Sequence, residues 1–253
     1  MPVPPDTHST DRLRPTTGWS LWLLAALFLA SPAVRSQETS PHVPGSGGIK
    51  GTVTITKPDE KPEDHMSHGL TSRYMTDPAG AELLVNPTEN KPYSLSERAV
   101  VYLEAVPGGK IQAPTEHQVL EQRGLKFHPE VLPVLVGTTV DFPNGDNLFH
   151  NVFSYSQAKE FDLGRYPLGD SRSVLFDKPG VVKVYCDIHS RMSAIILVLE
   201  NPFFASPDND GNFTISDIPE GKYRLCLWYS REVVLRRTVT VKTGEITTIA
   251  LTH

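Results

Sequence analysis

The stretch VYCDIHSRMSA, residues 184–194, carries three metal-ligand side chains within seven residues. It places Cys186, His189 and Met192 in the pattern C-x2-H-x2-M, directly after the β-branched run 181–185. Thiolate and thioether sulfur suit copper, and imidazole suits both of its common oxidation states. Because the segment joins two predicted strands, it can wrap all three side chains around one ion.

A further imidazole has to come from elsewhere in the chain, and His150 is the candidate. It ends the turn segment FPNGDNLFH, residues 142–150, and begins the next predicted strand. A plane of two imidazoles and one thiolate with a weak axial thioether is the geometry of blue-copper electron-transfer sites. The sequence therefore predicts one type 1 copper, with these ligands: His150, Cys186, His189 and Met192. A zinc site built from the two histidines and the cysteine is the alternative.

The residues around this motif predict an all-β fold. Short apolar or β-branched runs follow one another at 131–136, 138–142, 152–155, 173–176, 181–185 and 195–199. Turn residues separate them, at 143–146, 164, 169–170 and 178–180. Many short strands without a long amphipathic helix favour a Greek-key β-sandwich.

The last fifty or so residues continue the β pattern but are too few for a sandwich of their own. They need partner strands, and the candidates are 49–56, which contains the β-branched run 51–55, and 99–106. We therefore predict a nested arrangement, in which residues 49–110 and 201–253 form a small β-sandwich with a polar loop at 57–98, and residues 111–200 form an inserted domain. A sequential order, 37–200 followed by 201–253, is the alternative.

The N-terminal segment predicts export. Arg12 and Arg14 precede the apolar run WSLWLLAALFLA, residues 19–30, and small residues follow, in the order of a secretory signal. We expect a cleaved signal peptide at 1–36, a linker at 37–48, and a periplasmic or secreted protein without a membrane span. An uncleaved anchor is the alternative, although the run is shorter than the ~20 residues that cross a bilayer. The net charge of −5 argues against a nucleic-acid partner.

The motif and its surroundings resemble the cupredoxin family over residues 112–200. The C-x2-H-x2-M spacing looks like that of the amicyanins, and the pairs Tyr185-Cys186 and His150-Asn151 are similar to plastocyanin-like members. The resemblance implies that Asn151 ties the two ligand loops together by hydrogen bonds, and that the edge of His189 serves as the electron port. Many relatives have a proline between the cysteine and the second histidine, whereas this chain has Asp187-Ile188.

The flanking segments resemble carboxypeptidase-regulatory-like, or transthyretin-like, modules. The resemblance rests on residues 51–53, 210–213 and 219–223, which are turn-and-strand motifs of low specificity. It implies a fold and no catalytic residue. The polar loop also holds a low-priority auxiliary metal candidate, formed by His65, Met66, His68 and Met75; a solvated loop is the simpler interpretation. Cys226 is expected to be a buried free thiol.

Together these features predict an exported blue-copper protein that passes single electrons between redox protein partners such as a cytochrome or a dehydrogenase. Two alternatives stay open: a periplasmic copper carrier or storage protein, and a β-sandwich binding or adhesion module with an accessory copper domain. An enzyme is not expected, because no histidine is adjacent to Cys186 to serve a second copper centre, and no G-x-S-x-G or H-E-x-x-H motif occurs.

Overall fold

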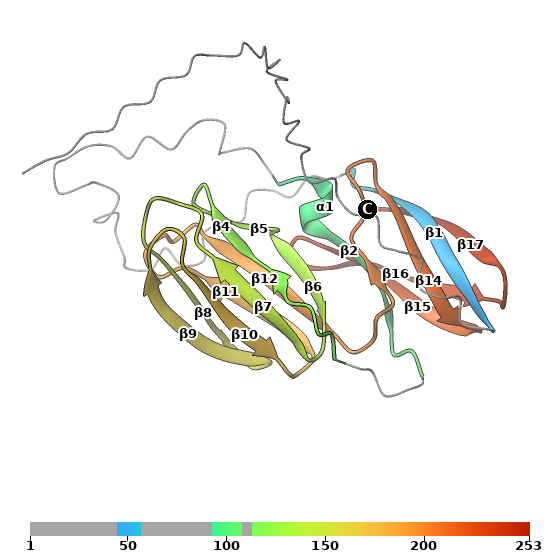
Figure 1. Ribbon diagram of the computed structural model, residues 1–253. Helices are drawn as coiled ribbons and strands as arrows, with labels where there is room; N and C mark the ends of the chain where they lie inside the picture. The colour runs from blue at the N-terminus through green and yellow to red at the C-terminus, as the bar shows by residue number, and fades with distance from the viewer. Residues whose placement is uncertain (1–44, 57–92, 108–112) are drawn as a thin grey trace, which may run out of the picture. The chain divides into compact units, whose positions relative to one another are not determined.

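The computed structural model describes residues 45–56, 93–107 and 113–253, and these residues are almost entirely β-structure (Figure 1). They form strands β1 to β17 and a single helical turn, α1 (Leu95–Arg98). The predicted all-β class is thereby confirmed. The predicted signal segment, and the loop residues His65, Met66, His68 and Met75, lie outside the described residues. Among the described residues, no helix has the length and apolar character needed to cross a membrane.

Residues 118–199 supply two facing sheets and a small hairpin. One sheet has five strands, in the order β6 (Val131–Leu135), β12 (Ser193–Leu199), β11 (Gly180–Tyr185), β8 (His150–Ser156) and β9 (Lys159–Tyr166). The other has three, in the order β10 (Ser171–Phe176), β7 (Thr138–Pro143) and β3 (Gln118–Val119). The hairpin pairs β4 (Glu121–Arg123) with β5 (Lys126–His128). Strand β6 pairs with β12, whereas β7, which follows β6 in the chain, lies in the other sheet, so the connections cross between sheets as in a Greek key.

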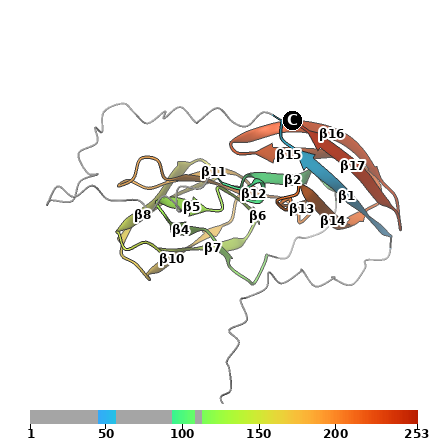
Figure 2. The ribbon, with the colours of Figure 1, turned by 90° about the horizontal axis from the view of Figure 1, so that it is seen from above.

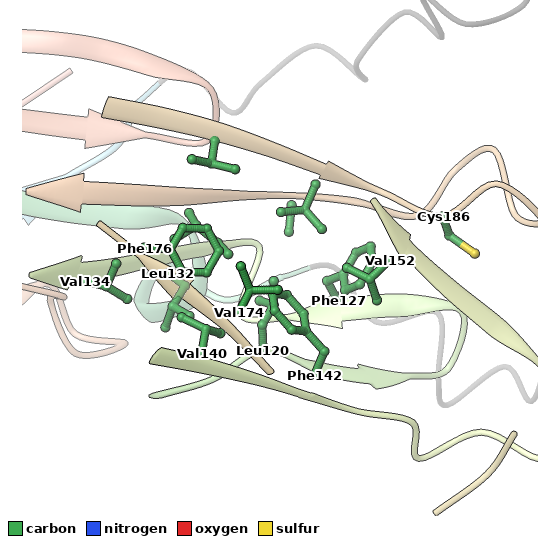
Figure 3. Packing of buried hydrophobic residues seen from close by; sticks show 14 of the residues in the cluster. Leu120, Phe127, Leu132, Val134, Val140, Phe142, Val152, Val174, Phe176 and Cys186 are labelled. Atoms are coloured by element: carbon green, nitrogen blue, oxygen red, sulfur yellow. The ribbon is translucent and has the colours of Figure 1, made fainter. Parts of the chain in front are cut away.

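Alternating side chains from both sheets meet in one core. In β7, Thr138, Val140 and Phe142 are buried while the residues between them are not, which is the period of two expected of a strand with one covered face. Val182 and Val184 of β11 face them from the other sheet. Figure 3 shows this packing, with Cys186 at one end of the cluster. The core therefore reaches up to the C-x2-H-x2-M loop.

Strand β9 was not predicted, because Gly164 was interpreted as a turn residue. Phe161 and Leu163 alternate with exposed neighbours and pack against the core, as a strand requires. Gly164 has a φ of 63°, and the β8–β9 register shifts between Asn151 and Phe153. A left-handed glycine inside a strand is characteristic of a β-bulge, so the glycine marks an irregularity and not the end of the strand.

The remaining strands form two further sheets around a second core. The first has the order β14 (Asn212–Pro219), β1 (Ser46–Thr54) and β17 (Ile246–Thr252). The second has the order β13 (Phe204–Ala205), β2 (Ala99–Glu104), β15 (Gly221–Tyr229) and β16 (Glu232–Val241). Strands from before residue 110 thus pair with strands from after residue 200, and apolar residues of both sheets share one buried cluster. The predicted domain boundaries themselves stay a prediction.

Strand β1 begins at Ser46, earlier than the run predicted at 51–55, and it includes residues 46–48 of the predicted linker. The sequence there, SGG, is poor in strand-forming residues. The sheet nevertheless requires glycine, because a Cβ at Gly47 would lie 2.3 Å from the carbonyl oxygen of Lys242. Packing against the backbone therefore outweighs local propensity at this strand.

A third apolar cluster joins the two sets of sheets. It contains Val100 and Trp228 from one set with Val131 and Ile195 from the other. Beside it, Arg98 Nε lies 2.6 Å from Glu130 Oε2, and both side chains are largely buried. All described residues fall within one of the two units of the chain. Figure 2 shows β1 between β14 and β17, in the order of their sheet.

Candidate metal centre

Three of the predicted ligands converge at one end of the first core. His150 is the first residue of β8, Cys186 follows the last residue of β11, and His189 lies in the loop before β12. The Nδ1 atoms of the two histidines are 3.0 Å apart. Cys186 Sγ is 3.9 Å from the Nδ1 atom of His150 and 3.6 Å from that of His189. Among the described residues, these three form the group that could hold a metal ion.

The spacing of the three donor atoms is itself informative. A triangle with these sides has a centre about 2 Å from every corner, which matches the usual distances of a metal ion to imidazole nitrogen (~2.0 Å) and approaches that to thiolate (~2.3 Å). The facing atoms are the Nδ1 atoms of the two imidazoles and the sulfur of Cys186, which are atoms that bind metals once deprotonated, and no side chain has to move to bring them together.

The loop that carries Cys186, His189 and Met192 is closed by its own backbone. Tyr185 pairs with Ser193, so residues 186–192 form the connection of the β11–β12 hairpin. Within it, the Met192 N–H donates to the His189 carbonyl at 2.9 Å, and the Cys186 N–H donates to the Met192 carbonyl at 3.3 Å. The Met192 side chain is buried and belongs to the same core cluster as Cys186. Its role as an axial ligand stays a prediction.

His150 is fully buried and is held on its far side by Asp146, a residue that the sequence analysis treated only as part of a turn. The Nε2 atom of His150 lies 2.8 Å from Asp146 Oδ2. Burial acts to lower the pKa of His150, but the hydrogen bond to Asp146 and the nearby Cys186 sulfur outweigh it and raise this pKa to about 9. The four-residue spacing of Asp146 and His150 was the available signal, and it is weak outside a helix.

The surroundings of the Cys186 thiol lower its pKa and so favour loss of its proton. Burial acts to raise its pKa, yet hydrogen bonds from His150 and His189, and from the backbone N–H groups of Asn151 and Ile188, lower it to about 6. Thiolate is the form that binds metals. The lowered pKa of Cys186 and the raised pKa of His150 together favour a thiolate–imidazolium pair over the neutral pair in the metal-free site.

Asn151 connects the two segments that carry the ligands. Its Oδ1 accepts from the backbone N–H of Asp187 at 3.4 Å, and its Nδ2 donates to Asp162 at 2.7 Å. It therefore links β8 to the residue after Cys186 and to β9. Its role in holding the ligand loops together stays a prediction. His189 is partly exposed, and close to it in sequence Asp187 forms an ion pair with Arg165 at 3.0 Å.

Comparisons with known proteins give partial likenesses. No known family model matches the chain, and no curated protein matches it. A purple cupredoxin from Nitrosopumilus maritimus is 26% identical over 32% of this chain and 99% of its own, with a TM-score of 0.30. A copper-containing nitrite reductase from Thermus scotoductus is 27% identical over 44% of this chain and 28% of its own (TM-score 0.33). A mutant of amicyanin with Cu(I) is 18% identical over 39% and 98% (TM-score 0.32). Likenesses of this size assign the chain to no family.

Proposed function

We propose that the protein is an exported mononuclear blue-copper protein that transfers single electrons between redox partners. The observation that carries this proposal is the convergence of two imidazole nitrogens and one cysteine sulfur at separations that suit a single ion. Copper would supply one-electron exchange between its two oxidation states. The buried thioether of Met192 in the same loop favours copper over zinc, because thioether sulfur is a soft donor.

Each of the three converging residues has a distinct role in such a site. The Cys186 thiolate provides the strongest donor, and its lowered pKa favours ionisation even without a metal. His150 is buried and fixed by Asp146, so it forms the rigid side of the site. His189 is partly exposed, and we propose its outer edge as the place where electrons enter and leave.

A carrier of this kind has to exchange electrons with a protein partner. Asp187 and Arg191 lie on either side of His189 in sequence and are exposed. Charges at the rim of a contact affect partner choice and association rate more than affinity. We therefore propose a redox protein as the partner. We also propose that the chain is a carrier and not an enzyme.

The visible spectrum of the copper-loaded protein tests the proposal. Cu(II) bound by the Cys186 thiolate should produce an intense thiolate-to-copper band, and Cys186→Ser should lack it. Reduction by one electron should bleach the band, and reoxidation should restore it. A protein that binds Cu(II) without colour would contradict the proposal. Uptake of more than one Cu(I) per chain, lost in a His65/His68 double variant, would instead support a copper carrier or storage protein.

A further inference from the structure

The turn of the small β4–β5 hairpin contacts the carboxylate of Asp146, which in turn contacts the candidate ligand His150. Gly124 and Leu125 form this turn, and both have left-handed backbones, with φ values of 62° and 59°. Their N–H groups donate to Asp146, to Oδ1 at 2.7 Å and Oδ2 at 3.0 Å respectively. A left-handed leucine is strained, because its Cβ lies close to the following carbonyl oxygen, so the surrounding structure has to hold it. The turn thus presents two backbone donors to an anion.

Buried side chains and hydrogen bonds anchor the hairpin beside this contact. Phe127 of β5 and Gln122 of β4 are completely buried. The side-chain amide of Gln122 donates to the Tyr166 hydroxyl at 2.6 Å, and the backbone carbonyl of Gln122 accepts from the Gly145 N–H at 2.8 Å. Tyr166 in turn pairs with His150 across β8 and β9. Hydrogen bonds and strand pairing therefore connect the hairpin both to the turn that contains Asp146 and, through Tyr166, to β8, which begins with His150.

Asp146 is also fixed from its own turn, because its N–H donates to Asn144 Oδ1 at 2.9 Å. Its side chain is only 13% exposed. The carboxylate consequently receives three donors: two backbone N–H groups and the Nε2–H of His150. With Nε2 committed to Asp146, the Nδ1 atom of His150 is the one that faces Cys186 and His189.

We propose that Asp146, held by the backbone N–H groups of the hairpin turn, is the positioning residue that orients His150 in this metal centre. We also propose that the charge of Asp146 favours Cu(II) over Cu(I). This inference rests on the proposed function. With the Cys186 thiolate and Asp146 both ionised, Cu(II) leaves the site close to neutral, whereas Cu(I) leaves one negative charge in a mostly buried place. Buried uncompensated charge is unfavourable, so Asp146 should lower the reduction potential.

The test compares two aspartates that lie close to the ligands in the sequence. Asp146→Asn removes the buried charge that touches His150 and keeps the shape of the side chain. Asp187→Asn removes an equal charge beside Cys186, but from a side chain that is 40% exposed and paired with Arg165. Water screens the second charge and not the first. We expect Asp146→Asn to raise the reduction potential of the copper protein, and to do so by more than Asp187→Asn.

A second measurement uses Asp146→Ala and does not depend on copper. Loss of a residue that orients a metal-binding histidine typically weakens metal binding by about 10–100-fold. We expect that loss for Co(II), measured by competition with a chelator on protein shown to be folded by circular dichroism. In the Zn(II)-loaded protein, the Nε2–H proton of His150 should be visible by NMR, and it should exchange rapidly in Asp146→Ala.

The two measurements separate this inference from the proposed function. An unaltered Co(II) affinity in folded Asp146→Ala, or a shift in Asp146→Asn no larger than in Asp187→Asn, would overturn the role of Asp146 while leaving a blue-copper protein in place. The opposite result is also distinguishable. If the wild type binds Co(II) more tightly than Asp146→Ala but shows no visible band with copper, the proposed function would fail while the role of Asp146 in holding the metal site would stand.

Discussion

The two cysteines of the chain are both buried free thiols, yet they have opposite chemical surroundings. Cys186 is surrounded by two imidazoles and two backbone donors, which lower its pKa to about 6 against the effect of burial. Cys226 lies within β15, where burial and the neighbouring Glu104 carboxylate raise its pKa to about 12. Burial therefore does not distinguish a ligand from a structural thiol; the neighbouring donors and charges do.

The position of each cysteine in its strand explains the contrast. Cys226 pairs with Tyr102 on one side and Arg236 on the other, so it is a central residue of a four-stranded sheet and its side chain packs in an apolar cluster. Cys186 follows the last residue of β11 and belongs to a loop. A strand end lets the chain turn and bring His189 back to the sulfur, whereas a strand interior does not.

Replacing each cysteine in turn gives the largest expected effect. Cys186→Ser should abolish the thiolate-to-copper band and weaken copper binding, because a hydroxyl does not replace a thiolate as donor. Cys226→Ser should retain the band at its wild-type position and intensity. Absorption spectra of the two copper-loaded variants, recorded at equal copper content, test this. A band that survives in Cys186→Ser would place the copper elsewhere.

Titration of the metal-free protein should separate the same two thiols. In Cys226→Ser, where Cys186 is the remaining thiol, the ultraviolet absorbance of thiolate should appear as the pH rises through about 6, because two imidazoles stabilise the ionised form. In Cys186→Ser, where Cys226 remains, no thiolate should form until the pH approaches about 12, because burial and Glu104 oppose it. Titration of both thiols at the pKa of ordinary cysteine would contradict the structure.

The sequence predicted the β class and the C-x2-H-x2-M loop because both depend on local patterns. Alternation of apolar residues and the Gly and Pro turns are properties of neighbouring residues. A short loop between paired strands also brings Cys186, His189 and Met192 together without knowledge of the rest of the fold. His150 was chosen because it ends a turn segment and begins a predicted strand; 36 positions separate it from Cys186, and the structure brings its Nδ1 within 3.9 Å of the sulfur.

What the sequence missed depends on contacts between distant segments. Gly164 signals a turn in isolation, but pairing with β8 keeps it in a strand. Gly47 and Gly48 are weak strand formers, but the close approach of Lys242 requires the first of them. Asp146 resembles any turn aspartate until the backbone donors of Gly124 and Leu125, 21 to 22 residues away, are brought to it. No local pattern contains this information.

The contact between the two sets of sheets should be sensitive to one buried ion pair. Arg98→Met leaves the Glu130 carboxylate, 9% exposed, without its partner at 2.6 Å. Breaking a buried pair from one side costs about 3–5 kcal/mol, whereas replacing both members with apolar residues is often close to neutral. Urea unfolding should therefore show a large loss of stability in Arg98→Met and substantial recovery in the Arg98→Met/Glu130→Leu double variant. Equal losses in both variants would assign the effect to lost packing of Arg98.

Removing an exposed ion pair beside the metal centre should have the smallest effect on the free energy of unfolding. This exposed pair therefore serves as the control for the buried pair. Arg165 and Asp187 are 3.0 Å apart, but their side chains are 62% and 40% exposed. Water screens such a pair, and ordering two side chains opposes its attraction, so measured values are about 0–1 kcal/mol. Arg165→Gln should therefore change the free energy of unfolding in urea by less than about 1 kcal/mol. Because high salt screens exposed charges, even this difference should shrink as salt is added, whereas the Arg98→Met loss should persist. A loss in Arg165→Gln as large as that in Arg98→Met would mean that exposure does not decide the strength of these two pairs.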